Sequence, residues 1–214
     1  MIKMNIVFAY PTGLNPQKGG VERITDIIAK ILLKRGYTIF YLNWKREQDN
    51  YEYPVPVIDL PSSNLEDPNN LEVYNRFLKE NRIDVIINQH GLYEGTYFLS
   101  QVKVQNVKII SVLHSDPFGY YNHLFADLMT LRDSSIKEKV KRVARFFLYR
   151  KVKKIIHRSL VNHYTFIQEH PQYVCLLSES YKERLEEYCD LPDNYFISIP
   201  NPNTYENIEI IPHK

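Results

Sequence analysis

Five short polar segments of this sequence each follow an apolar, strand-like run. They are residues 12–20, 89–91, 114–116, 178–180 and Asn201. In an open parallel sheet, ligands bind outside the carboxyl ends of the strands, so all five segments are expected at one edge. Each segment alone is equally compatible with a helix cap or a turn. Their shared position is what indicates a ligand-binding site.

Two adjacent glycines, Gly19 and Gly20, precede a helix expected to begin near Val21 and Glu22. The free N–H groups and positive dipole end of such a helix can bind an anion such as a diphosphate, and glycine lets the anion approach the backbone. The alternative is a tight turn that packs the helix on the sheet. Neither a G-x-G-x-x-G nor a G-x-x-x-x-G-K-[ST] motif occurs, so nicotinamide-dinucleotide and P-loop binding are disfavoured.

Two histidines lie just after the ends of predicted strands. His114 comes after the apolar residues 109–113, so its ring is expected to point into the crevice where the strand order reverses. A histidine there could donate a hydrogen bond to a sugar hydroxyl or carbonyl, or stabilise charge in a transition state. His90 occupies the same position after its own strand, beside Gly91. A purely structural histidine is the alternative in both cases.

The sequence predicts no metal, no cofactor and no serine nucleophile. His157, His163 and His170 lack carboxylates at ligand spacing, and no Asp-x-Asp occurs. The Gly-x-Ser-x-Gly motif of serine hydrolases is also absent. The two cysteines, Cys175 and Cys189, are expected to be reduced thiols.

The elements that would position these residues alternate between strand and helix. The predicted strands are residues 4–10, 38–42, 84–88, 108–113, 173–177 and 195–199, with a short one near residues 55–60. The predicted helices are residues 21–35, 71–81, 120–159 and 179–189, and residues 93–104 form either a helix or an irregular connection. Residues 159–172 are expected to form a loop. This alternation predicts an α/β fold with a Rossmann-like, doubly wound parallel sheet over residues 1–200. Residues 201–214 are expected to begin an interdomain linker.

A strongly basic segment runs from Lys137 to Arg158. It holds ten Lys or Arg and one acid in a chain whose formal net charge is only +2, so the remainder is acidic. As a helix it would carry one apolar face, made of Val140, Val143, Ala144, Phe147, Leu148, Val152, Ile155 and Ile156.

Three interpretations of the basic segment compete. The apolar face packs in the core under a solvated basic face, or the helix adheres to an anionic membrane surface, or it binds nucleic acid. Nucleic acid is disfavoured because the rest of the chain is acidic and no nucleic-acid motif is present. In the membrane case the basic contacts would be Lys141, Arg145, Lys153 and Lys154.

The chain contains no apolar run near the ~20 residues that a membrane-spanning helix needs, and its start lacks the apolar core of a secretory signal. We therefore expect a cytoplasmic protein, with peripheral contact at the inner face of the cell membrane. Its 214 residues, 44% of them hydrophobic, can bury the core of one domain.

Four motifs occur in order along the chain: Gly19-Gly20-Val21-Glu22-Arg23, Ser111-Val112-Leu113-His114-Ser115, Val174-Cys175-Leu176-Leu177-Ser178-Glu179 and Ile199-Pro200-Asn201-Pro202-Asn203. Together they resemble the amino-terminal domain of GT-B-fold retaining glycosyltransferases of family 4. The resemblance extends from about Met4 to Asn203.

The resemblance implies a two-domain enzyme in which this half binds the acceptor and a carboxyl-terminal half binds the nucleotide sugar. Gly19 and Gly20 would then face the donor diphosphate, and His114 would be the catalytic residue beside the donor sugar. Residues of the acceptor site or the cleft would be Glu22, His90, Ser178 and Asn201. The reaction would need no metal, in agreement with the missing Asp-x-Asp.

Two features qualify what the resemblance implies. His114 is followed by Ser115-Asp116, whereas many members of the family carry Asp directly after the histidine. The donor-binding half should begin after the linker, so residues 1–214 alone are expected to be inactive. The expected activity is hexosyl transfer to a glycan or lipid-linked acceptor in cell-surface polysaccharide synthesis. The alternatives are a nucleotide-sugar epimerase of the same architecture and a stand-alone ligand-binding module.

Overall fold

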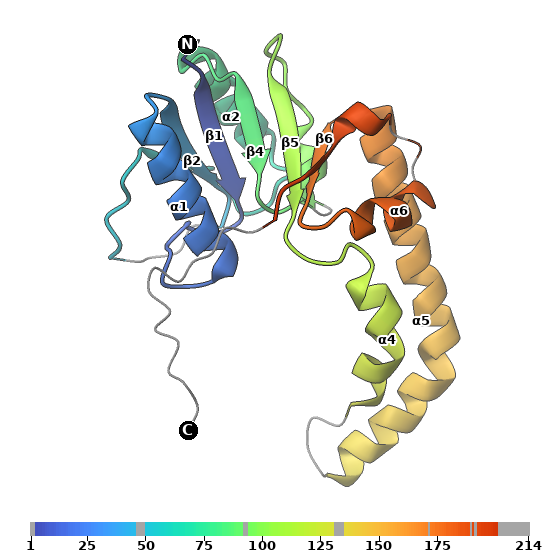
Figure 1. Cartoon of the computed structure of the whole chain (residues 1–214). Coiled ribbons are helices and arrows are strands. Elements are labelled where there is room, and N and C mark those ends of the chain that lie inside the picture. Colours follow the sequence, from blue (N-terminus) through green and yellow to red (C-terminus); the bar gives the residue numbers. More distant parts are fainter. Residues whose placement is uncertain are drawn as a thin grey trace, which may run out of the picture.

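The computed structural model describes residues 3–45, 50–91, 94–130, 135–170, 172–188, 190 and 192–200. Its centre is a seven-stranded sheet, all parallel, in the order β3-β2-β1-β4-β5-β6-β7 (Figure 1). The strands are β1 (Asn5–Tyr10), β2 (Thr38–Asn43), β3 (Val57–Asp59), β4 (Val85–Asn88), β5 (Lys108–Leu113), β6 (Tyr173–Leu176) and β7 (Phe196–Ser198). The predicted Rossmann-like α/β fold is confirmed. The predicted linker, residues 201–214, lies outside the described residues.

Helices cover the sheet on both faces, as the continuous apolar runs of its central strands require. They are α1 (Gly20–Lys34), α2 (Pro68–Glu80), α3 (Glu94–Leu99), α4 (Gly119–Met129), α5 (Ile136–Glu169) and α6 (Ser180–Glu186), with a 3₁₀ turn at Asp193–Tyr195. The side chains of successive residues of β1 lie on opposite faces of the sheet. Phe8 packs in the cluster that contains Ala29 of α1, and Val7 packs in the cluster that contains Tyr74 of α2. Both β1 side chains are fully buried.

The strand order reverses between β1 and β4. The chain runs from β1 through β2 to β3 at one edge, then returns to β4 and continues outward to β7 at the other. Loops that leave neighbouring strands in opposite directions open a crevice at such a switch point. The crevice therefore lies beyond Tyr10 and Asn88, the last residues of β1 and β4.

The end of α5 differs from the sequence prediction. A loop was predicted over residues 159–172, but α5 continues to Glu169. Leu160, Tyr164 and Ile167 follow one another at helical spacing and are buried against Leu113 of β5 and Val174 of β6. This burial keeps the segment helical, and the polar residues between these positions concealed the pattern.

The first half of α5 also corrects an expectation. The apolar side chains between positions 137 and 158 do not form one face that packs in the core. Val140, Val143 and Phe147 are 63%, 56% and 77% exposed. Here α5 packs against α4, and the two helices project from the sheet as a hairpin (Figure 1). Within the described residues, no helix is both long enough and apolar enough to cross a membrane.

Candidate functional site

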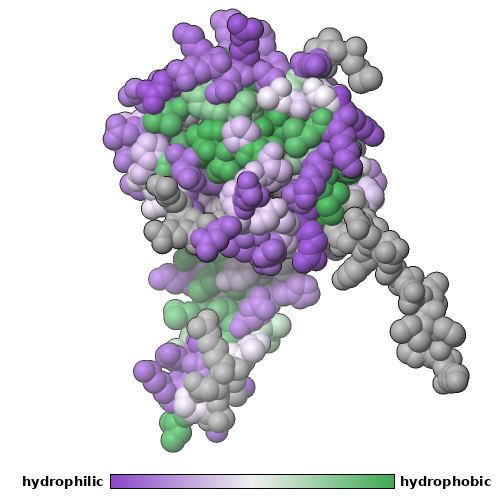
Figure 2. Space-filling view, turned by 90° about the vertical axis from the view of Figure 1, so that its left-hand side faces the viewer, coloured by the Kyte–Doolittle hydropathy of each residue, from purple (hydrophilic) through white to green (hydrophobic). Residues whose placement is uncertain are grey.

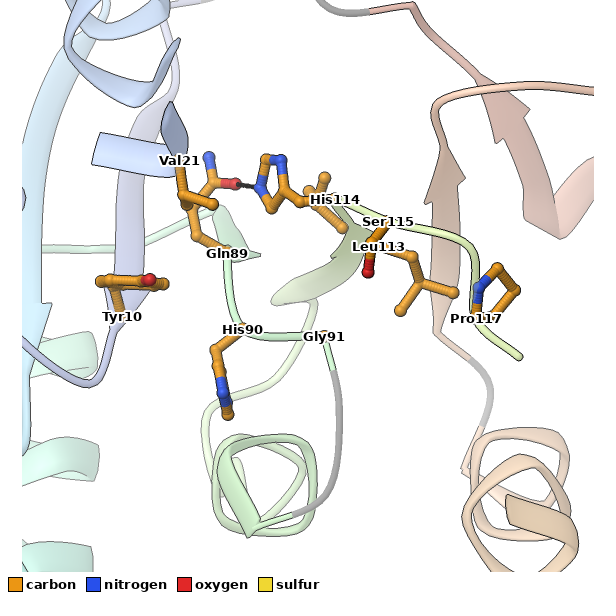
Figure 3. A pocket seen from close by; sticks show the side chains of 10 residues that line it. Tyr10, Val21, Gln89, His90, Gly91, Leu113, His114, Ser115 and Pro117 are labelled. Carbon is orange, nitrogen blue, oxygen red and sulfur yellow. Dashed lines mark hydrogen bonds between the residues drawn. The ribbon is translucent and has the colours of Figure 1, made fainter. Parts of the chain in front are cut away.

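A pocket of about 140 Å³ opens at the switch point of the sheet (Figure 3). Its walls come from the ends of β1, β4 and β5 and from the first turn of α1. It is lined by Tyr10, Val21, Gln89, His90, Gly91, Val112, Leu113, His114, Ser115 and Pro117. The structure thus brings together two of the predicted site residues, His90 and His114, at the predicted edge.

His114 is held in the pocket by Gln89. The His114 Nε2 lies 2.6 Å from the Gln89 Oε1, a contact that joins the turn after β4 to the end of β5 (Figure 3). Burial lowers the pKa of His114 to about 4, so the ring is neutral at pH 7. Because an amide oxygen only accepts, Nε2 carries the proton and Nδ1 is left as an acceptor.

The Nδ1 of His114 is buried and has no hydrogen-bond partner among the described residues. A buried polar atom without a partner is unfavourable unless a ligand or water supplies one. A hydroxyl group of a bound molecule would satisfy this atom by donating to it. The pocket therefore offers one buried acceptor to a ligand that carries a hydroxyl donor.

A chain of buried polar side chains fixes the turn behind the pocket. The Asn88 Nδ2 donates to the Ser111 Oγ and the Thr96 Oγ1, over 3.3 Å and 3.2 Å. The Ser111 Oγ in turn donates to the Gln172 Oε1 over 2.8 Å. The Asn88 Oδ1 accepts from the backbone N–H of His90 at 3.1 Å. This network joins β4, β5 and α3, so the backbone that carries Gln89 and His90 is held rigidly.

Gly91 lets the same turn pass directly over β5. A Cβ at Gly91 would lie 2.5 Å from the backbone oxygen of Val112, so no other residue fits without moving the strand. Below the turn, His163 of α5 is fully buried. Burial lowers the pKa of His163 to about 4, and its hydrogen bond with the Gly91 backbone acts in the opposite direction. In the sequence, His163 was a candidate only for metal binding, and nothing near it indicated this supporting contact.

The His90 ring turns away from His114 (Figure 3). It lies edge-on to Tyr10 and Trp44, with centroid distances of 6.2 Å and 6.4 Å. Its pKa is lowered, first by burial. The two histidines are therefore neighbours in the pocket wall but do not form a catalytic pair.

The predicted anion site at the start of α1 has one open side. A Cβ at Gly20 would meet no atom within 4 Å, so a ligand can reach its backbone. A Cβ at Gly19 would instead clash with the carboxylate of Glu22. Glu22 is only 8% exposed, and its charge adds to the effect of burial in raising the pKa of Tyr10. One carboxylate thus already lies near the positive end of this helix, which weakens its attraction for an anion.

The remaining predicted cleft residues lie elsewhere. The Ser178 Oγ is 2.9 Å from the Ser180 Oγ at the start of α6, and Ser178 does not line the pocket. Asn201 lies outside the described residues. The roles proposed for Gly19, Gly20, Glu22, His90, His114, Ser178 and Asn201 stay predictions.

Asp116, two residues after His114, shapes the loop that follows. Its Oδ1 accepts from the Phe118 backbone N–H at 2.9 Å, which fixes the approach to α4. Its Oδ2 lies 2.5 Å from the Arg184 Nη1 of α6. The carboxylate is therefore used within the protein and does not enter the pocket, which is lined at this point by Ser115.

The four basic residues predicted to face a membrane have different surroundings. The Arg145 Nη2 lies 2.7 Å from the Glu138 Oε1, and the Lys141 Nζ lies 3.9 Å from the Glu138 Oε2. The Lys153 Nζ lies 4.9 Å from the ring centroid of Tyr121. Lys154 is exposed. Membrane contact by these four residues stays a prediction, although only Lys154 is unengaged by a described side chain.

An apolar groove of about 170 Å³ adjoins the pocket on the α1 face of the sheet. Gln89 and His114 line both spaces. Its other walls are apolar side chains of α1 and the strands, with Cys175 among them: Phe8, Ile24, Ile28, Ile87, Ile110, Val112, Cys175, Leu177, Ile199 and Pro200. The Gln89–His114 pair therefore lies between the pocket and the groove. In the described part of the chain, no group of three His, Cys, Asp or Glu could hold a metal ion.

The chain matches a protein family and is similar in fold to solved structures. The model of the family described as Glycosyltransferase Family 4 matches residues 18–202. A search of curated proteins found no match. Among solved structures, a glycosyltransferase from Rickettsia africae has a TM-score of 0.53 and 16% identity, over 92% of this chain and 43% of that chain. WaaG, a glycosyltransferase involved in lipopolysaccharide biosynthesis, has a TM-score of 0.50 and 15% identity, over 91% and 44%. The chain thus spans less than half the length of either structure.

Proposed function

Since the chain belongs to glycosyltransferase family 4, we propose that it is the acceptor-side half of a retaining enzyme that transfers a sugar from a nucleotide-sugar donor. The observation that carries the proposal is the buried, unpartnered Nδ1 of His114 in the pocket at the switch point. A sugar hydroxyl supplies the donor that this atom lacks. The pocket lies at the edge where α/β sheets of this kind bind their ligands.

In the proposed reaction, the bond from the anomeric carbon to the diphosphate breaks and a bond to the acceptor oxygen forms, while the proton of the acceptor hydroxyl passes to the leaving diphosphate. The sugar becomes oxocarbenium-like while charge grows on the diphosphate. The neutral His114 ring would hold a donor-sugar hydroxyl through Nδ1, and the open backbone at Gly20 would receive the diphosphate. Neither role requires a metal or a further cofactor. Fixed dipoles that meet charge as it develops stabilise the transition state more than the ground state.

The rest of the proposal concerns the missing half and the substrates. The chain covers 43% and 44% of the two similar glycosyltransferases, and we infer that a donor-binding domain completes the cleft. Glu22, His90, Ser178 and Asn201 would border the acceptor. The proposed donor sugar is a hexose. The proposed acceptor is a glycan or lipid-linked molecule in cell-surface polysaccharide synthesis, and the proposed site of action is the cytoplasmic face of the membrane.

The test uses the full-length protein encoded by the gene, assayed against a panel of nucleotide hexoses with extracted lipid-linked and soluble glycan acceptors. We expect retention of the anomeric configuration in the product, and we expect His114→Ala to lower kcat by ~100-fold, the scale of losing one preorganised hydrogen bond in an active site. Residues 1–214 alone should release no nucleotide. Transfer by this half alone, or an unchanged rate in His114→Ala, would overturn the assignment.

The same assay separates the alternatives. Conversion of the donor sugar without an added acceptor would identify an epimerase. Binding of glycans without any turnover by the full-length protein would identify a binding module. Either result contradicts the proposed transfer.

A further inference from the structure

One continuous stripe along the outer side of α5 changes from apolar to basic. Its members recur at spacings of three or four residues, so they share one face of the helix. All are exposed, and the first four are apolar and the last three basic: Ile136, Val140, Val143, Phe147, Lys151, Lys154 and Arg158. We call these seven residues the outer stripe. Its apolar part is unusually open to solvent, with Ile136 at 80% and Phe147 at 77% exposure.

The opposite side of α5 is occupied by the contacts of the hairpin. Tyr149 lies edge-on to Phe125 of α4, with ring centroids 5.2 Å apart. The Lys153 Nζ lies over the ring of Tyr121, also on α4. These contacts fix which side of α5 faces α4, so the outer stripe points away from the rest of the protein. Figure 2, which is seen from the left-hand side of Figure 1, shows hydrophobic and hydrophilic residues side by side on the near face of the projecting part at the bottom.

The charge of this surface has one sign. Residues 137–158 contain ten basic residues and one acid, Glu138. The Glu138 side chain is 5% exposed and paired with Arg145 and Lys141, so it does not offset the charge at the surface. Beside the basic end of the stripe, the surface is hollowed between Lys151, Lys154, Arg158, Ser159 and Asn162. A phosphate-bearing group would find cationic and hydroxyl donors there.

We propose that the α4–α5 hairpin docks the protein on an anionic lipid bilayer through the outer stripe. The apolar part, from Ile136 to Phe147, inserts into the boundary between headgroups and acyl chains. Lys151, Lys154 and Arg158 bind lipid phosphates beside it. This inference rests on the proposed function at the membrane face and gives it a surface. It also assigns the membrane contact to Lys154 and excludes Arg145, which is held by Glu138.

Other occupants fit the surface less well. A second copy of the chain would bring two basic faces together, and like charges at an interface are repulsive. Nucleic acid would satisfy the basic end of the stripe but leave Val140, Val143 and Phe147 exposed to water. A bilayer with anionic lipids meets both needs at once, since interfacial helices combine a buried apolar face with basic residues at the headgroups.

The test is sedimentation of the chain with sucrose-loaded vesicles of phosphatidylcholine alone or with phosphatidylserine added. We expect binding to the anionic vesicles only. The triple variant Lys151→Gln/Lys154→Gln/Arg158→Gln should bind roughly 100-fold more weakly, since each basic residue contributes about fivefold. Phe147→Ser with Val143→Ser should also weaken binding, by ~10-fold or more. The matched control Lys34→Gln/Lys79→Gln/Lys103→Gln removes the same charge from the sheet domain and should bind as the parent does.

Several results would overturn the proposal. Equal loss in the control and in the stripe variant would show only a general charge effect, and binding unchanged by the serine variant would exclude insertion. A concentration-dependent dimer that Phe147→Ser disperses, without vesicle binding, would show that the stripe joins two copies. Circular dichroism of each variant checks that the helices remain. Transfer to a soluble acceptor by the full-length protein is measured separately, so failure of docking and failure of the proposed activity are distinguishable.

Discussion

The amide oxygen of Gln89 lies 2.6 Å from the Nε2 of His114 and links the turn after β4 to the end of β5. This contact sets which nitrogen of His114 carries the proton and leaves the other nitrogen as an acceptor. Both residues line the pocket and the adjoining apolar groove. The tautomer of His114 is therefore a property of the pair and not of the histidine alone.

We predict that Gln89→Glu raises the pKa of His114 from about 4. The carboxylate would replace a neutral acceptor at the same position and favour the imidazolium. The measurement is a titration of the histidine ring signals by NMR. Gln89→Leu is the matched variant, because it removes the acceptor without adding charge. It should leave a mixture of the two neutral tautomers of His114, with the proton on Nε2 in some molecules and on Nδ1 in others. A pKa that does not rise in Gln89→Glu would contradict the contact.

Gly91→Ala and Gly20→Ala are predicted to have opposite effects on stability. The new Cβ at Gly91 would lie 2.5 Å from the Val112 backbone oxygen, and a strand backbone cannot yield cheaply. We expect a loss of about 2 kcal/mol in the free energy of unfolding, measured with urea. At Gly20 the methyl group meets open space, and alanine favours a helix, so stability should be unchanged or rise by up to ~0.5 kcal/mol.

The same pair of variants also tests the proposed diphosphate contact. In the full-length protein, Gly20→Ala should raise the KM for the nucleotide sugar while the fold stays intact, because the methyl group occupies the open side of the helix start. An unchanged KM would place the diphosphate elsewhere.

His163 should make the protein less stable in mild acid. Its pKa is about 4 in the folded protein because of burial, against about 6.5 when unfolded. The unfolded chain therefore takes up a proton between those values that the folded chain does not. Above pH 6.5 His163 does not lower the free energy of unfolding. As the pH drops from 6.5 toward 4, this group lowers the free energy of unfolding by about 1.4 kcal/mol per pH unit. The free energy of unfolding, measured across this range, should fall less steeply in His163→Gln; an equal slope in both proteins would be evidence against this origin.

The fold could be predicted because its central strands appear in the sequence as apolar runs, which are typical of a parallel sheet covered by helices on both faces. The run ending at Tyr10 and the one ending at Leu113 are examples. The edge that carries the pocket followed from the same runs, since parallel strands share one carboxyl end. His114 was found in this way, as the first polar residue after its strand.

The partners of these residues could not be predicted, because they are distant in the sequence. Gln89 is 25 residues from His114, and its neighbourhood is created only when β4 pairs with β5. His163 supports Gly91 from a helix that was expected to have ended. In the basic segment, composition predicted an amphipathic helix but not which side α4 would cover. The covered side of α5 is set by Tyr121 and Phe125 of α4, which contact Lys153 and Tyr149.

Arg145 and Lys154 belong to the same basic segment but should behave differently when neutralised. Arg145→Gln leaves the buried Glu138 carboxylate with only Lys141 at 3.9 Å. Loss of one partner of a buried ion pair is costly, so we expect roughly 2 kcal/mol of local destabilisation. Amide hydrogen exchange should accelerate in α4 and in the first half of α5, while the sheet keeps its protection.

Lys154→Gln is the matched control, because it removes the same charge from an exposed site that has no ion pair with a described residue. It should leave hydrogen exchange unchanged and weaken vesicle binding by about fivefold. The double variant Glu138→Gln/Arg145→Gln should recover most of the lost protection, since it leaves no buried charge without a partner. Arg145→Gln with unaltered exchange but weakened vesicle binding would reverse the assignment of the two residues and place Arg145 at the membrane.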